Sequence, residues 1–139
     1  MSNLLENQLV YNVPNAPLRP FPYPHIYVPN VFPPELYAEI QRHMPDPAAM
    51  LPIAEARPVR GYKERFVLDP AQHMERLPAD QANFWSNLRA LLLKGMFRAS
   101  LVEKFHETIN RRFAGQTVQF SVETLLVEDQ THYALGPHT

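Results

Sequence analysis

The sequence predicts an α+β fold, with residues 1–139 forming a single domain. Two segments between residues 80 and 113 repeat apolar residues at helical spacing. From Thr117 onward the pattern changes to the two-residue period of a strand. With 139 residues, the chain has the length of one domain with one hydrophobic core. We therefore expect helices packed against a sheet.

Proline dominates the first part of the chain. The sequence has 15 prolines and only 4 glycines, and "PNAPLRPFPYPHIYVPNVFPP", residues 14–34, contains eight of the prolines. Because proline lacks an N–H and restricts the residue before it to extended geometry, residues 14–24 are expected to form an extended arm along a surface. The apolar pattern "HIYV", residues 25–28, then predicts a short strand.

A helix is expected to begin at Pro33 or Pro34 and to end before Pro45. Proline suits the first turn of a helix because its φ angle is already set and its missing N–H would have no helical partner there. One apolar stripe of this helix is formed by Leu36, Tyr37, Ile40 and Met44.

The middle of the chain mixes loops with short elements. "GYKERFVLD", residues 61–69, predicts a loop that leads into a short strand. Asp69, followed by proline, is a start signal for a short helical turn through Glu75. Asp80 can cap a longer helix, in which one face carries Phe84, Trp85, Leu88, Leu91 and Leu92.

A second long helix is expected to follow Gly95 and to end near Gly115. Glycine interrupts a helix readily and closes its C-terminus well. The apolar face of this second helix is formed by Phe97, Leu101, Val102, Phe105 and Ile109. We expect the two long helices to carry most of the apolar core.

The last predicted strand changes its character along its length. In residues 117–123 apolar and polar residues alternate, which predicts a strand with one buried face. The following "TLLV", residues 124–127, is apolar on both faces, as is typical of a central strand. Little sequence remains after it to supply neighbouring strands. We therefore expect the 139 residues to be the first part of a longer, truncated chain.

Composition excludes several classes of function and partner. The 13 Lys and Arg residues balance 14 Asp and Glu residues, so the formal net charge is -1, and we expect no nucleic-acid partner. The chain has no cysteine, which excludes disulfides and thiolate metal sites. It has neither an apolar run of membrane-spanning length nor a basic leader before an apolar segment. We expect a cytoplasmic protein without a membrane partner.

Three parts of the sequence resemble a known family. They are the opening "PFPYPHIYVPNVFPPELYAEIQRHMPD", the two long helices before a strand, and the segment "LLVEDQTHYALGPHT". Together they resemble the N-terminal part of a non-haem Fe(II)- and 2-oxoglutarate-dependent oxygenase of the prolyl-hydroxylase-like superfamily. The resemblance implies helices that back an incomplete double-stranded β-helix, or jelly-roll, sheet. It also implies a dioxygenase that hydroxylates a small molecule or a peptide.

The resemblance assigns site residues only at the end of the sequence. It implies that His138 is the first iron ligand, within the family's His-x-Asp motif, and that the carboxylate follows Thr139. Tyr133 matches a tyrosine that contacts 2-oxoglutarate or lines the pocket, and a packing aromatic is an equal interpretation. The second histidine and the basic residue for 2-oxoglutarate are expected on later strands. The cofactors would be Fe(II) and 2-oxoglutarate, and the 139 residues alone are expected to be inactive, with no catalytic residue assigned.

Other polar residues carry weaker hypotheses. The spacing of His132 and His138 fits no helical ligand pair. A basic cluster could hold an anionic substrate, although a solvated loop is its ordinary role; it comprises Arg57, Arg60, Lys63 and Arg65. The remaining histidines are interpreted as surface or core residues, namely His25, His43, His73 and His106.

An alternative to the enzyme is a non-catalytic interaction module. Such a module would bind a partner, or a second copy of itself, through the proline arm or by adding its last strand to another sheet. A homo-oligomer through an exposed strand is the assembly that this alternative predicts.

Overall fold

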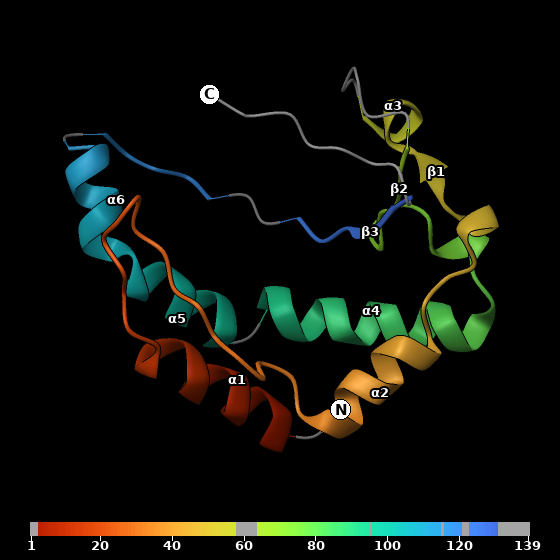
Figure 1. Ribbon diagram of the computed structural model, residues 1–139, viewed down its shortest axis with the longest axis horizontal. Coiled ribbons are helices and arrows are strands. Elements are labelled where there is room, and N and C mark those ends of the chain that lie inside the picture. Colours follow the sequence, from red (N-terminus) through yellow and green to blue (C-terminus); the bar gives the residue numbers. More distant parts are fainter. Residues whose placement is uncertain (1–2, 58–63, 95, 115, 121–122, 131–139) are drawn as a thin grey trace. The chain divides into compact units, whose positions relative to one another are not determined.

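The computed structural model describes residues 3–57, 64–94, 96–114, 116–120 and 123–130 (Figure 1). Within these residues the protein has six α-helices, two short 3-10 helices and one three-stranded antiparallel sheet. The predicted α+β class is therefore confirmed. The chain divides into two compact units, and each unit combines two separate segments: residues 1–42 with 87–122, and residues 43–86 with 123–139.

The first unit begins with a helix that the sequence pattern did not predict, α1 (Asn3–Asn15). Its buried residues Leu9 and Val13 are four positions apart, so they share one face, and α1 packs beside α5 (Met96–Lys104) (Figure 1). The Nζ atom of Lys104 donates a hydrogen bond to the carbonyl of Pro14 at 2.6 Å. The expectation of an extended chain from Pro14 is wrong at this point. Pro14 lies in the last turn of α1, where its missing N–H removes one i→i−4 hydrogen bond and favours the end of the helix at Asn15.

The proline arm continues from α1 without regular structure. Arg19 and His25 form a single antiparallel bridge, with N···O distances of 2.8 and 2.9 Å, around a short loop. Phe21 in this loop is 84% exposed. The strand predicted for residues 25–28 is wrong, because only His25 finds a backbone partner there.

The helix predicted after the arm is confirmed as α2 (Pro34–Arg42). It begins at Pro34, as the preset φ angle of proline favours. Its apolar stripe is only partly covered, since Leu36 is buried whereas Tyr37 is 54% exposed.

The second long helix of the prediction is two helices, α5 and α6 (His106–Arg112). Phe105 separates them with φ -102° and ψ 6°, which departs from helical geometry. Neither helix contributes a buried residue, so the expectation that this region carries much of the core is wrong. The first predicted long helix is confirmed as α4 (Ala79–Lys94), which buries Trp85 and Leu88.

The second unit is built on the sheet, whose strand order is β1 (Leu51–Pro52), β2 (Arg65–Leu68) and β3 (Leu126–Asp129). In its register Val67 pairs with both Leu51 and Val127. The central strand β2 buries Val67 and Leu68 completely. This confirms the strand predicted in "GYKERFVLD".

The strand predicted for residues 117–123 is wrong where the structure describes it. Residues 116–120 form no strand, and Phe120 is exposed, with its carbonyl accepting a hydrogen bond from Arg98 Nη2 at 3.2 Å. The strand begins later, at Leu126, because β2 offers only four residues for pairing. Within the described residues β3 pairs on one side only, so it lies at the edge of the sheet and not at its centre.

Short elements connect these strands and position the site described below. The helix α3 (Ile53–Ala56) follows β1 and packs against β1 and β2. A predicted turn after Asp69 is present, although its regular part is the 3-10 helix η2 (Met74–Arg76). The other 3-10 helix, η1 (Pro47–Ala49), is capped by the side chain of Asp46.

Candidate functional site

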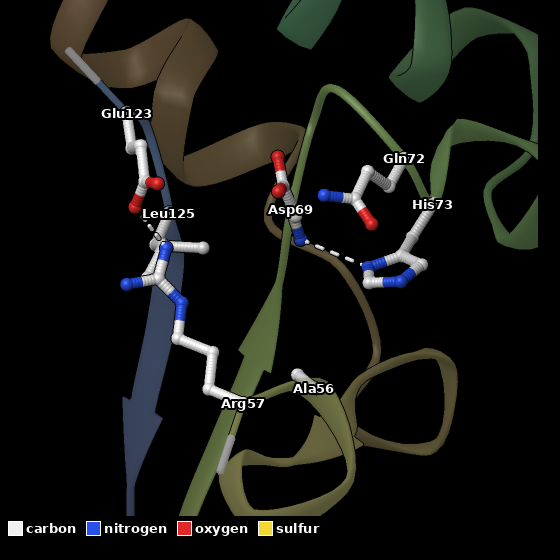
Figure 2. Close-up of a pocket in the computed structure, with 7 residues that line it drawn as sticks. All are labelled: Ala56, Arg57, Asp69, Gln72, His73, Glu123 and Leu125. Carbon is white, nitrogen blue, oxygen red and sulfur yellow. Dashed lines mark hydrogen bonds and ion pairs between the residues drawn. The ribbon is translucent and has the colours of Figure 1, made fainter. Parts of the chain in front are cut away.

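A polar pocket with a volume of about 350 Å³ lies in the second unit (Figure 2). Three stretches of chain form it: the end of α3, the turn after β2, and the residues that lead into β3. The pocket is lined by Ala56, Arg57, Asp69, Gln72, His73, Glu123 and Leu125.

The turn after β2 is fixed by hydrogen bonds around Asp69. Its carbonyl accepts from the backbone N–H groups of Gln72 and His73, at 3.0 and 2.9 Å. Its carboxylate Oδ1 accepts from the N–H of Ala71 at 2.8 Å. This side-chain bond to the backbone two residues later is the usual reason why aspartate starts a turn. The sequence therefore holds the Asp69 carboxylate at a defined place on the pocket wall.

His73 closes the same turn from the other end. Its Nδ1 atom lies 3.2 Å from the backbone nitrogen of Asp69, as Figure 2 shows. Because a backbone N–H can only donate, Nδ1 accepts, and the ring carries its N–H on Nε2. The imidazole is thus bonded to the backbone of Asp69 and not to its carboxylate. The two residues do not form the carboxylate–imidazole pair that general-base catalysis commonly uses.

An ion pair connects two other parts of the pocket wall. The Nη2 atom of Arg57 donates to Oε2 of Glu123, which joins the end of α3 to the residues before β3 (Figure 2). The two side chains are 35% and 63% exposed, so the pair contributes little to stability. Its main effect is to position the guanidinium at the pocket.

The charged and polar side chains of the lining give the pocket a polar binding character. It combines one guanidinium, two carboxylates, an amide and an imidazole. In the part of the chain that the structure describes, no three His, Asp or Glu side chains are grouped closely enough to hold a metal ion. The arrangement can bind a small charged molecule, and the pairing of Arg57 with Glu123 already holds two of the groups in place.

The site residues assigned by resemblance, Tyr133 and His138, lie outside the described residues, as does His132. Of the basic cluster, the structure describes Arg57 and Arg65, and these two residues do not form a single anion site. Arg57 pairs with Glu123, whereas Arg65 pairs with Asp129 at the far end of β3.

The remaining histidines occupy separate places. His25 Nδ1 lies 2.8 Å from the Tyr23 carbonyl, and His106 Nε2 lies 3.0 Å from the Asn110 amide nitrogen. The ring of His43 stacks on Phe84 with centroids 4.3 Å apart. Among the histidines that the structure describes, only His73 lines the polar pocket. The sequence signal that could have found it was the Asp69 turn, because a histidine four residues after the start of such a turn can reach back to it.

The first unit has an apolar hollow of about 430 Å³ at the start of α2. It is lined by Asn30, Val31, Phe32, Pro34 and Tyr37. The described lining residues are uncharged, so they offer an apolar packing surface.

Comparison with known proteins identifies no family for this chain. No protein-family model matches the sequence, and no curated protein and no solved structure is significantly similar to it. Among the described residues, none of the helices is sufficiently long and apolar to cross a lipid bilayer.

Proposed function

We propose that the chain is the N-terminal part of an Fe(II)- and 2-oxoglutarate-dependent dioxygenase. The observation that carries the proposal is the segment "HYALGPHT", residues 132–139, which follows the antiparallel strand β3. In this family a strand and a short turn lead to the His-x-Asp iron motif. His138 is then an iron ligand, and Tyr133 contacts 2-oxoglutarate or lines its pocket.

The proposal extends to the fold of the enzyme, its class of substrate and its cellular compartment. Its sheet would be the start of a jelly roll, with β3 leading to strands contributed by later sequence, and residues 1–139 would be part of one oxygenase domain. The antiparallel pairing of β2 with β3 supports this, because a double-stranded β-helix is built from antiparallel strands. The substrate is a small molecule or a peptide. The absence of cysteine supports a reducing compartment, which we propose to be the cytoplasm.

The described residues do not fit an iron site by themselves. A facial triad needs two imidazoles and one carboxylate, and no such group occurs among the residues that the structure describes. The proposal takes one ligand from His138 and expects the others from sequence after Thr139. No catalytic step is therefore assigned to the described side chains.

The test uses the natural reading frame beyond Thr139. We expect aspartate as the next residue, and a histidine and a basic residue further on. In that longer protein, His138→Ala should abolish Fe(II) binding and 2-oxoglutarate decarboxylation, measured by metal analysis and by release of carbon dioxide. His132→Ala is the matched control and should keep both activities, because His132 does not match the motif. A reading frame without the aspartate, or a fully active His138→Ala variant, would refute the proposal.

A second candidate is the non-catalytic interaction module, and the edge position of β3 favours it. Val127 on β3 is 42% exposed, and within the described residues the strand pairs only with β2. An unpaired strand edge can add a strand from another chain. This candidate predicts a dimer of the 139-residue chain in light scattering, and Val127→Lys should convert it to a monomer. A wild-type monomer at high micromolar concentration would exclude this candidate.

A further inference from the structure

The polar pocket contains a carboxylate, that of Asp69, for which the described part of the chain supplies no cationic partner. Asp69 lines the pocket, and its Oδ1 atom accepts from the N–H of Ala71. Within the residues that the structure describes, no Lys, Arg or His side chain forms an ion pair with Asp69. A carboxylate can accept about four hydrogen bonds. Asp69 therefore retains capacity to bind a positively charged group.

Arg57 brings the opposite charge to the same pocket. Its Nη2 atom donates to Glu123, and this is the one hydrogen bond that its side chain forms in the described part of the chain. A guanidinium has about five N–H donors on a planar fork, so another edge of the fork can receive a second carboxylate. The ion pair with Glu123 holds the guanidinium without using all its donors.

Two apolar side chains and two further polar ones complete the wall. Ala56 and Leu125 line the pocket and can cover an aliphatic group. Gln72 and the Nε2–H of His73 can donate hydrogen bonds to a bound molecule. The lining therefore offers one cationic partner, one anionic partner and a small apolar surface (Figure 2).

We infer that this pocket binds a small zwitterion, such as a free aliphatic amino acid, with its carboxylate on Arg57 and its ammonium on Asp69. A molecule with only one of the two charges would form only one of these two contacts. The site therefore distinguishes a zwitterion from an amine or a carboxylic acid of the same shape. This inference is independent of the proposed oxygenase function, because it needs neither iron nor 2-oxoglutarate.

The experiment compares three ligands of matched shape by isothermal titration calorimetry in metal-free buffer. They are L-leucine, its decarboxylated analogue 3-methylbutylamine and its deaminated analogue 4-methylpentanoate. We expect the wild-type chain to bind L-leucine roughly two- to fivefold more tightly than either analogue, since each contact is a partly exposed ion pair. Equal binding of the three ligands, or no binding of L-leucine at millimolar concentration, would overturn the inference.

Variants assign each charge to its residue. Arg57→Gln should remove the preference for L-leucine over the amine, and Asp69→Asn should remove the preference over the acid. Asparagine keeps the side-chain oxygen that accepts from Ala71, so the turn is preserved. Glu123→Gln weakens the ion pair that positions the guanidinium, so it should reduce the preference for L-leucine over the amine and keep the preference over the acid. Retention of both preferences in Arg57→Gln and Asp69→Asn would overturn the inference.

A control on the same segment tests whether the effect is local. Glu75 is an exposed acid of η2 that does not line the pocket. Glu75→Gln removes one negative charge, as Asp69→Asn does, and should leave the affinity for L-leucine unchanged. Equal losses of affinity in Glu75→Gln and Asp69→Asn would show a general effect of net charge and would contradict the assigned contact.

Discussion

The guanidinium of Arg65 binds the carboxylate of Asp129 with two parallel hydrogen bonds. Nε donates to Oδ1 at 2.7 Å, and Nη2 donates to Oδ2 at 2.8 Å. The two residues are also partners in the register of β2 and β3. The side-chain pair thus reinforces the end of the ladder at which β3 finishes.

The same contact makes the pairing of β2 and β3 sensitive to acid. Hydrogen bonding from Arg65, together with its positive charge, lowers the pKa of Asp129 from the ordinary value of 3.8, although desolvation acts in the opposite direction. A carboxyl group whose pKa is lower in the folded state stabilises that state above its unfolded pKa. This contribution is lost as the pH falls through the folded pKa.

Asp129→Asn should therefore lower the melting temperature at neutral pH and have progressively less effect below about pH 4. Thermal unfolding followed by circular dichroism across this pH range measures the difference between variant and wild type. Glu128→Gln, on the same strand, is the control that neutralises an acid outside the pair. A difference that stays constant down to pH 2 would contradict the assignment to the Arg65 contact.

Trp85 should be the most sensitive aromatic position in the second unit. It is 5% exposed, and its Nε1–H donates to the His43 carbonyl at 2.7 Å. We expect Trp85→Phe to cost about 1–2 kcal/mol, because the carbonyl loses its donor and the core loses volume, and Trp85→Ala to cost about 3–5 kcal/mol. Urea unfolding measures both, with the exposed neighbour Ser86→Ala as the control. Equal stability of Trp85→Phe and wild type would show that the hydrogen bond is not stabilising.

Leu9 tests whether α1 belongs to the core of the first unit. Its exposed fraction is 0%, and its helix packs against α5. Leu9→Ala should lower the free energy of unfolding by about 2–5 kcal/mol, whereas Asn7→Ala on the exposed side of α1 should have little effect. Chemical denaturation gives both values. Similar small effects in the two variants would mean that α1 does not pack as described.

The turn at the polar pocket should loosen when its imidazole acceptor is removed. His73→Ala leaves the backbone N–H of Asp69 without its side-chain partner, at a cost of about 0.5–1.5 kcal/mol. We expect faster hydrogen exchange at the Asp69 amide, measured by NMR. His106→Ala is the control, since His106 is exposed on α6, where its ring is hydrogen-bonded to the side chain of Asn110. Unchanged exchange at Asp69 would contradict the role assigned to Nδ1.

The sequence predicted those helices and strands that depend on residues close together in the chain. The start of α2 at Pro34, the strand in "RFVL" and the amphipathic α4 follow from proline geometry and apolar spacing. The strands predicted at residues 25–28 and 117–123 are wrong because a strand also needs a neighbouring strand with which its backbone can form hydrogen bonds. The partner of β3 is β2, about 60 residues earlier in the chain, and its short length limits pairing to Leu126–Asp129.

The candidate site could be predicted only in part, because some of its contacts join residues far apart in the sequence. Asp69 carries a recognisable turn signal, and the structure shows that this turn is formed. The contact between Arg57 and Glu123 joins residues 66 positions apart, and no local pattern indicates it. The assignments of Tyr133 and His138 depend on resemblance and stay predictions.

The discontinuous make-up of the two compact units has a consequence during translation. Leu9 and Val13 are buried residues of α1, and α1 packs against α5, which starts at Met96, about 80 residues later in the chain. At a synthesis rate of about 5–20 residues per second, the ribosome needs roughly 4 to 16 seconds to supply that helix. During this interval the apolar face of the nascent N-terminal helix is exposed, and it is a natural binding site for a chaperone that acts on growing chains.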